Sequence, residues 1–328
     1  KKSSPLVIGI GGEGDYYVAS DATPIIEYTK NVVYLEDEEI ALISLKNDLK
    51  IITIQNQQKT PYIQELEMQL EALEKGGYDY FMLKEIFEQP RSVRDCYRGR
   101  MNLKKGMIRM SGIDAHEDKW MNASRILIVA CGTSWHAGLV AEYLFEDLAR
   151  IPVEVEYASE FRYRNPIINK DDIVIAISQS GETADTLAAI KLAKEKGAHI
   201  FGVCNVVGST ISRETDSGAY THAGPEIGVA STKAFTAQVT VLTLMALSVA
   251  QKKGTINEKR LHRLMAEINS IPDKIELALK TDDLVKSVSN IYKEASNALY
   301  LGRGYSFPVA LEGALKLKEI SYIHAEGY

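Results

Sequence analysis

The chain has 328 residues, of which 45% are hydrophobic and 25% charged, and its formal net charge is −6. This composition is typical of a globular protein with more than one core, and the negative charge argues against a general role on nucleic acids or membrane surfaces. The three cysteines, Cys96, Cys131 and Cys204, show neither a disulfide pattern nor metal-ligand spacing. We therefore expect a reducing, cytoplasmic location and no metal or other cofactor.

Short apolar runs alternate with turns over residues 5–55, at 6–10, 16–19, 31–35, 40–43 and 51–54. The spacing leaves no room for crossover helices, so it predicts a mainly antiparallel sheet. Glycines at 11, 12 and 14 follow the first of these strands, but no helix comes after them. They are better explained as a turn than as a dinucleotide-binding loop. We expect residues 56–110 to form a helical connector whose amphipathic helix, beginning near Tyr80, breaks at Gln89–Pro90.

From Ser124 onward the pattern becomes that of an α/β protein, with apolar runs at 125–130, 153–157, 172–177 and 200–204. Helices of about a dozen residues fit between them, which predicts a doubly wound parallel sheet that binds ligands at the carboxyl ends of its strands. The uncharged run 234–250 has only 17 residues and includes threonines and a glutamine. A buried core helix is a better interpretation of this run than a membrane span.

The α/β pattern starts again near the end of the sequence. A charged helical segment at 255–297 is followed by a strand at 298–301 and a helix at 308–322, which indicates a second α/β domain. We therefore divide the chain at 1–55, 56–110, 111–275 and 276–328. Because one strand and one helix bury no core, and because the sequence begins with Lys1 rather than Met, we expect it to be part of a longer chain.

A hydroxyl-rich loop follows the strand at 172–177 and leads into a helix from Ala184 to Lys196. The unpaired N–H groups and partial positive charge of a helix N-terminus attract phosphate. Ser178, Ser180 and Thr183 add side-chain donors there, so the loop is a candidate phosphate site. Without the lysine of a Walker loop, a phosphorylated metabolite fits better than a nucleotide. The alternative is an ordinary turn in which a hydroxyl only caps the helix.

The helix after Pro308 carries a second candidate group. Glu312, Lys316 and Glu319 are spaced i, i+4 and i+7, so they share one face. A carboxylate and an amine placed in this way could move protons beside a carbonyl, and an exposed row of ion pairs is the alternative. His324 is a further candidate acid or base. His136 and His222 have no partners at metal-ligand spacing.

Five segments resemble the glutamine–fructose-6-phosphate aminotransferase family in sequence and in order. They are Cys-Gly-Thr-Ser at 131–134, Ala-Ser-Glu-Phe-Arg-Tyr at 158–163, Ser-Gln-Ser-Gly-Glu-Thr-Ala-Asp-Thr at 178–186, Glu-Ile-Gly-Val-Ala-Ser-Thr-Lys-Ala at 226–234, and the segment 310–326. The resemblance implies two sugar isomerase (SIS) domains preceded by the end of an N-terminal glutaminase domain. It also implies a homodimeric enzyme that takes ammonia from glutamine and converts fructose 6-phosphate into glucosamine 6-phosphate.

The same resemblance implies the roles of individual residues. Glu319 would move a proton between two sugar carbons, and Lys316 would serve the adjacent hydroxyl. The residues implied in sugar phosphate binding are Ser178, Gln179, Ser180, Thr183, Thr133, Ser134 and the backbone of Val229. The family's N-terminal cysteine nucleophile and its C-terminal histidine and lysine have no counterpart in this sequence, so we expect it not to complete the reaction alone. A non-catalytic sugar-phosphate sensor and a plain ketose–aldose isomerase remain alternatives, although neither needs a glutaminase segment.

Overall fold

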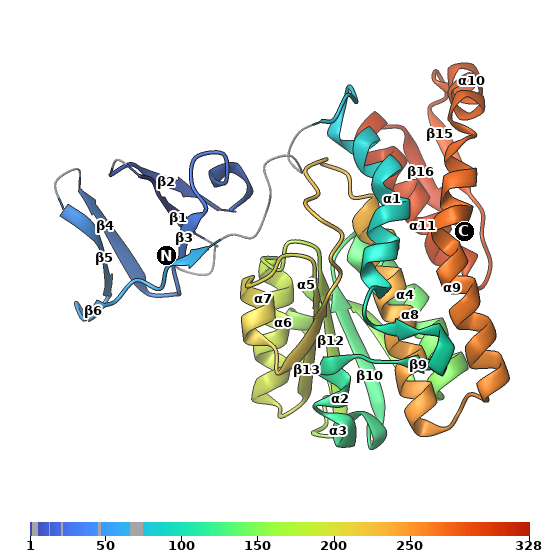
Figure 1. Ribbon diagram of the computed structural model, residues 1–328, viewed down its shortest axis with the longest axis horizontal. Helices are drawn as coiled ribbons and strands as arrows, with labels where there is room; N and C mark the ends of the chain where they lie inside the picture. The colour runs from blue at the N-terminus through green and yellow to red at the C-terminus, as the bar shows by residue number, and fades with distance from the viewer. Residues whose placement is uncertain (2–5, 13, 21, 45–46, 66–74) are drawn as a thin grey trace. The chain divides into compact units, whose positions relative to one another are not determined.

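The computed structural model describes residues 1, 6–12, 14–20, 22–44, 47–65 and 75–328, and it divides into two units, Lys1–Gly76 and Gly77–Tyr328 (Figure 1). The elements of the first unit are β1 (Val7–Ile10), β2 (Tyr16–Ala19), the 3-10 helix η1 (Thr23–Ile25), β3 (Asn31–Tyr34), β4 (Glu39–Ser44), β5 (Asn47–Thr53), β6 (Gln58–Lys59) and β7 (Gln64–Glu65).

Two antiparallel sheets build the first unit, with strand orders β2-β1-β3-β7 and β4-β5-β6, which confirms the predicted antiparallel arrangement. Successive side chains of a strand point to opposite faces. Val7 accordingly packs with Ile25 and Ile26, whereas Ile8 packs with Leu49 and Ile51. Strands β6 and β7 lie in the segment that we expected to be helical.

The second unit begins with the helical and hairpin elements α1 (Phe81–Tyr97), β8 (Met101–Asn102), η3 (Leu103–Lys105), β9 (Met107–Ile108), α2 (Ser111–Asp114) and α3 (Glu117–Met121). Its central elements are β10 (Arg125–Ala130), α4 (Thr133–Leu144), the π-helical turn η4 (Phe145–Ala149), β11 (Val153–Tyr157), α5 (Ala158–Tyr163), β12 (Asp172–Ser178), α6 (Ala184–Glu195), β13 (His199–Cys204), α7 (Thr210–Glu214) and β14 (Ser217–Tyr220). It ends with α8 (Lys233–Lys253), α9 (Glu258–Leu279), α10 (Asp282–Tyr292), β15 (Asn297–Tyr300), α11 (Ser306–Ser321) and β16 (His324–Gly327).

A five-stranded parallel sheet of order β11-β10-β12-β13-β14 forms the centre of this unit, which confirms the predicted parallel sheet and adds one strand to it. The side chains of β12 alternate between two cores. Ile173 and Ile175 pack on the side of α4 and α8, and Val174 and Ala176 on the side of α5, α6 and α7 (Figure 1). The strand order reverses between β10 and β12, and ligands of open α/β sheets bind in the crevice at the carboxyl ends of such a pair.

Strand β14 was absent from the sequence prediction. Its residues Ser217–Tyr220 include no branched aliphatic side chain, so the apolar run that marks a buried strand is missing. Within β14, Gly218 has no room for a side chain, because an added Cβ would lie 2.6 Å from the carbonyl oxygen of Gly202 on β13. Helix α2 also approaches the strand closely. A Cβ added to Gly112 would lie 2.5 Å from the carbonyl oxygen of Gly218.

The predicted break at Gln89–Pro90 is wrong, because α1 continues through Pro90. A proline inside a helix leaves the carbonyl four residues earlier without its donor. Here that carbonyl belongs to Ile86, and the Gln89 side chain donates to it from Nε2 at 3.0 Å. The preceding glutamine thus replaces the missing backbone hydrogen bond, and α1 packs along α8 and α9.

Helix α8 contains the uncharged run and is long and apolar enough to cross a membrane by length and composition. In this fold, 67% of its most apolar 18-residue stretch is buried, and the helix packs against α1 and α4. This burial supports the predicted core helix.

The C-terminal segment forms a parallel β15-α11-β16 unit, and α11 packs against α4 of the main sheet. This contact between elements that are far apart in the sequence carries the α11 side chains to the edge of the sheet where α4 begins.

Candidate functional site

In the loop after β12, the serine hydroxyls form hydrogen bonds with the backbone of the same loop. Ser178 ends the strand, and its Oγ accepts a hydrogen bond from the Gly181 amide at 3.0 Å and lies 3.0 Å from Thr183 Oγ1. Ser180 Oγ accepts from the Glu182 amide at 3.2 Å. The loop is therefore held in a defined, tightly turned conformation, with Gln179, Ser180 and Thr183 half-buried.

Gly181 is required by this turn. Its φ of +69° lies in the left-handed region, and an added Cβ would collide with the side chain of Ser209, at the start of α7. The Ser209 hydroxyl is buried and has no partner among the described residues. The loop is thus seated against α7, and the Ile211 amide donates to the Gly181 carbonyl at 2.9 Å.

The first turn of α6 has no side-chain cap from any residue that the structure describes, so the simple capping alternative does not account for the hydroxyls. Asp185 lies in that turn, but its carboxylate is paired at 2.7 Å with Arg162 of α5. Backbone N–H groups at a helix N-terminus that no side chain caps can donate to an anion, and several hydroxyls lie beside them here.

The loop after β10 lies beside this one, because β10 and β12 are paired in parallel register. Ser134 is buried, and its Oγ accepts from Gln238 Nε2 of α8 at 3.0 Å. Thr133 Oγ1 instead contacts α11, donating to Glu312 Oε1 at 2.9 Å and accepting from Lys316 Nζ at 3.1 Å.

Helix α11 presents its acid and amine groups on one face, as the spacing predicts. Lys316 Nζ lies 2.7 Å from Glu319 Oε2 and 3.4 Å from Glu312 Oε1. The Lys316 side chain is only 17% exposed, unlike that of a solvated ion-pair row. His324 lies outside this group, exposed on β16 and 3.2 Å from Glu326.

Sequence spacing gave no sign of a partner for His136. In the fold its Nδ1 lies 2.6 Å from Glu312 Oε2, and both side chains are buried. No cluster of potential metal ligands occurs among the described residues, so this pair is a hydrogen-bonded unit.

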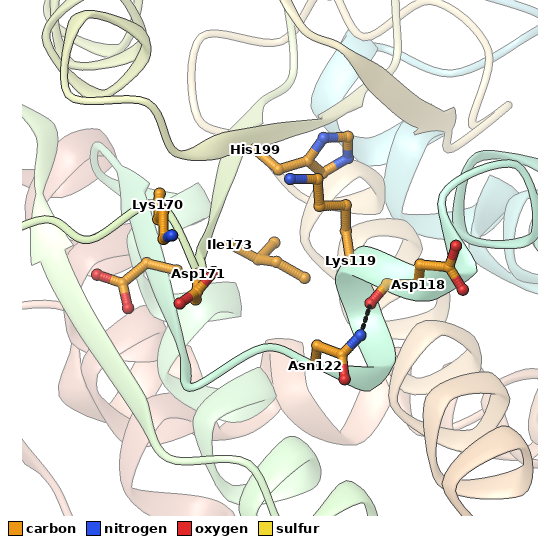
Figure 2. Close-up of a pocket in the computed structure, with 8 residues that line it drawn as sticks. Asp118, Lys119, Asn122, Lys170, Asp171, Ile173 and His199 are labelled. Atoms are coloured by element: carbon orange, nitrogen blue, oxygen red, sulfur yellow. Dashed lines mark hydrogen bonds between the residues drawn. The ribbon is translucent and has the colours of Figure 1, made fainter.

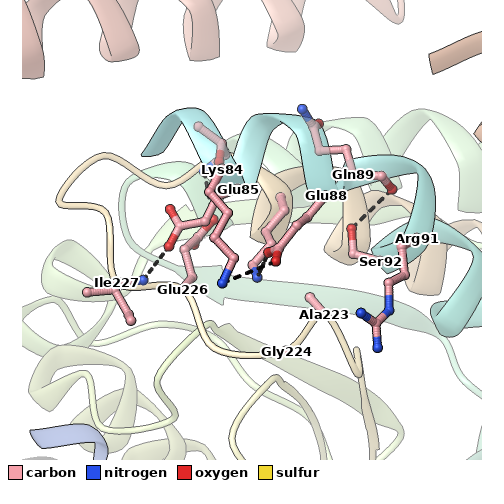
Figure 3. A network of polar contacts seen from close by, with 12 residues as sticks. Lys84, Glu85, Glu88, Gln89, Arg91, Ser92, Ala223, Gly224, Glu226 and Ile227 are labelled. Carbon is pink, nitrogen blue, oxygen red and sulfur yellow. Dashed lines mark hydrogen bonds and ion pairs between the residues drawn. The ribbon is translucent and has the colours of Figure 1, made fainter. Parts of the chain in front are cut away.

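Val229 lies in the loop that leads into α8, and its side chain is fully exposed. Two carboxylates hold the backbone of this loop. Glu226 accepts from the amides of Thr232 and Ala234. Glu85 of α1 accepts from the amide of Gly228 at 3.1 Å and from that of Ile227 at 2.6 Å, the latter contact being drawn in Figure 3.

Burial raises the pKa of Glu85, although the two amide hydrogen bonds oppose this shift. Beside it, Lys233 Nζ donates to Glu88 at 2.6 Å. Helix α1 thereby fixes the loop that exposes Val229.

Asn205 connects this loop to the one after β12 and was missed by the sequence analysis. Its backbone N–H donates to the backbone carbonyl of Gln179 at 3.2 Å, and its side-chain Nδ2 donates to the backbone carbonyl of Gly224 at 2.7 Å. A lone asparagine after a strand carries no recognisable signal. The loops around Thr133 and Gln179 are thus neighbours through the pairing of β10 and β12, and Lys316 contacts Thr133 directly. Asn205 connects the Gln179 loop to the segment that contains Val229.

A separate pocket of about 210 Å³ lies at the opposite edge of the sheet, where β12 and β13 begin. Figure 2 shows Lys119 and Lys170 on either side of Ile173, with His199 above them. Burial lowers the pKa of His199, which favours its neutral form. None of the predicted site residues lines this pocket.

Comparisons with known proteins agree with this geometry. A model of the SIS domain matches residues 120–248. Glutamine–fructose-6-phosphate aminotransferases (isomerizing) of Bacteroides thetaiotaomicron and Chlorobaculum tepidum are 60% and 58% identical over all 328 residues, which cover 53% of each relative. The chain therefore spans about half the length of these curated relatives.

A solved structure agrees as well. The C-terminal domain of glucosamine-fructose-6-phosphate aminotransferase from Francisella tularensis is 41% identical, with a TM-score of 0.74 over 78% of this chain and 71% of that one. Sequence, fold and the arrangement of loops around the β10–β12 edge thus lead to one conclusion: the chain belongs to the glutamine–fructose-6-phosphate aminotransferase family.

Proposed function

We propose that the protein takes ammonia from glutamine and converts fructose 6-phosphate into glucosamine 6-phosphate, the first step of amino-sugar synthesis. Family membership supports this proposal. The observation that carries it is the pair of hydrogen bonds from Thr133 to Glu312 and Lys316, because they join the candidate sugar loop to the helix that bears the acid and the amine.

In this proposal the sugar phosphate binds to Ser178, Gln179, Ser180 and Thr183, at the N-terminus of α6. The uncapped first turn of α6 supports this assignment, since its amides are free to bind phosphate oxygens. Thr133, Ser134 and the backbone of Val229 contact the sugar. Thr133 gives its only hydroxyl proton to Glu312, so it serves a sugar hydroxyl as an acceptor.

The carboxylate of Glu319 is the proposed base. Ketose–aldose conversion removes a proton from one sugar carbon and returns it to the neighbouring carbon, so a single carboxylate that reaches both carbons is sufficient. The Lys316 ammonium lies 2.7 Å from that carboxylate and donates to the sugar oxygen on which negative charge develops.

The proposal includes the organisation of the whole protein. Residues 1–55 form the end of a glutaminase domain, 56–110 a connector, 111–275 the first SIS domain and 276–328 the start of the second. We further propose a cytoplasmic homodimer that needs no cofactor and binds neither nucleic acid nor membrane.

Glu319→Gln in the full-length protein tests the proposal. We expect turnover to fall at least about 100-fold, the lower range of what a positioned base provides, while the free energy of fructose 6-phosphate binding changes by less than about 1 kcal/mol. Glu267→Gln, on the exposed surface of α9, is the matched control.

Glucosamine 6-phosphate formation and calorimetric binding are measured on the same preparations. Near-normal turnover would remove Glu319 from the mechanism. Sugar-phosphate binding by a wild-type protein without turnover would instead assign it to the non-catalytic sensors.

A further inference from the structure

The pair formed by Glu312 and His136 is the most deeply buried acid–base contact beside the candidate site. The side chains are 7% and 8% exposed, and they come from α11 and α4, which are 176 positions apart in the sequence. A buried carboxylate is costly unless it is paired and hydrogen-bonded. Glu312 meets this requirement with Thr133, His136 and Lys316.

The two oxygens of Glu312 have different partners. Among the residues that the structure describes, Oε2 has His136 Nδ1 as its one partner, whereas Oε1 accepts from the Thr133 hydroxyl and lies 3.4 Å from Lys316 Nζ. The Lys316 ammonium is closer to Glu319, at 2.7 Å. Two carboxylates therefore compete for one ammonium, and the hydrogen bonds of Glu312 decide which of them holds it.

We propose that His136 is a positioning residue for the sugar reaction, which it serves by occupying Glu312 Oε2 with its Nδ1–H group. This proposal rests on the proposed function. With Oε2 satisfied, Glu312 keeps Oε1 on Thr133 and leaves Lys316 beside Glu319. Without His136, Oε2 is buried without a donor, and the carboxylate turns to the nearest cation. Lys316 then moves away from Glu319, and the acid–base pair loses its alignment.

The chemistry of the donor atom provides a sharp test in the full-length protein. In His136→Asn the amide nitrogen takes nearly the place of Nδ1 and donates to Glu312. In His136→Gln the donor lies one bond further out, near the place of Nε2. We expect His136→Ala and His136→Gln to lower kcat about tenfold or more with less than about a threefold change in KM, and His136→Asn to restore most of kcat.

His199→Ala is the matched control, since His199 is a buried histidine at the opposite edge of the sheet. We expect it to lower Tm to an extent comparable with His136→Ala and to leave kcat unchanged. If His136→Ala does not fold, the comparison of the Asn and Gln variants still decides the question.

Each result has a distinct meaning. Full kcat in His136→Ala, or equal loss in the Asn and Gln variants, would overturn the positioning role and leave the proposed function intact. A wild-type protein that forms no glucosamine 6-phosphate and does not isomerise fructose 6-phosphate would overturn the proposed function itself, together with the role inferred from it.

Discussion

Gly181→Ala tests whether the loop after β12 depends on its close packing against α7. At a φ of +69°, an alanine costs about 1–2 kcal/mol in backbone strain. Its methyl group also collides with the side chain of Ser209, and such overpacking adds about 1–3 kcal/mol. The two effects have different origins, so a suitable control can separate them.

Gly197→Ala is that control. Gly197 follows the C-terminus of α6, the helix that begins after the β12 loop, at a φ of +86°, but its added Cβ meets none of the described atoms within 4 Å. It therefore carries the backbone strain without the collision. In a unit of about 250 residues, 1 kcal/mol corresponds to about 2–4 °C, so we expect Gly181→Ala to melt roughly 2–12 °C below Gly197→Ala.

Thermal unfolding is measured for both variants with and without fructose 6-phosphate. We expect the sugar phosphate to stabilise Gly197→Ala as it does the wild type, and to stabilise Gly181→Ala much less because the loop is displaced. Ser209→Gly removes the colliding atoms, so the double variant Gly181→Ala/Ser209→Gly recovers part of the loss. Equal melting temperatures of the two alanine variants would refute the packing argument.

Three further predictions concern other sites. Ser180→Ala in the full-length protein is expected to weaken fructose 6-phosphate binding about tenfold or more, and unchanged affinity by calorimetry would argue against the phosphate assignment. Burial alone would raise the pKa of Asp172, but hydrogen bonds, led by that from its arginine partner, outweigh burial and lower it. The stability advantage of wild type over Asp172→Asn is therefore present above about pH 4 and shrinks as the pH falls below it, which urea titrations at several pH values would detect. Burial raises the pKa of Cys96 and Cys204 to about 12 and raises that of the half-buried Cys131, so alkylation at pH 8 followed by peptide mass spectrometry should find Cys131 modified first. Modification of Cys96 or Cys204 at the same rate in the folded protein would contradict their burial.

The sequence predicts well those elements whose burial produces a local pattern of apolar residues. The run 172–177 is apolar throughout because its residues alternate between two buried faces, and that pattern alone indicates a central parallel strand. The common edge of the loops at 131–134 and 178–183 follows from a parallel sheet, whereas the order of its strands comes from the structure alone. The sharing of one face by Glu312, Lys316 and Glu319 is equally local, since helical geometry requires it.

Features that depend on distant partners escape this kind of reasoning. His136 and Glu312 meet because α11 packs on α4, and no spacing within either segment reveals the contact. Strand β14 lacks an apolar run, and at Gly218 the backbone of β13 leaves no room for a side chain. Pro90 is tolerated because a single glutamine side chain replaces one hydrogen bond, an exchange that a general rule for proline misses.

The place of α8 in the chain affects how the protein is made. Every strand of the parallel sheet precedes this helix, and so do its neighbours α1 and α4. Because a chain leaves the ribosome from its N-terminus, the sheet and the helices α1 and α4 that pack on α8 are synthesised before α8 itself, whereas its neighbour α9 follows it. This long apolar helix thus emerges after most of its packing partners, which limits its exposure to the membrane-insertion machinery and to other nascent chains. A gene rearranged to encode α8 ahead of the strands would reverse this order, and the helix would then have no packing partners when it is synthesised.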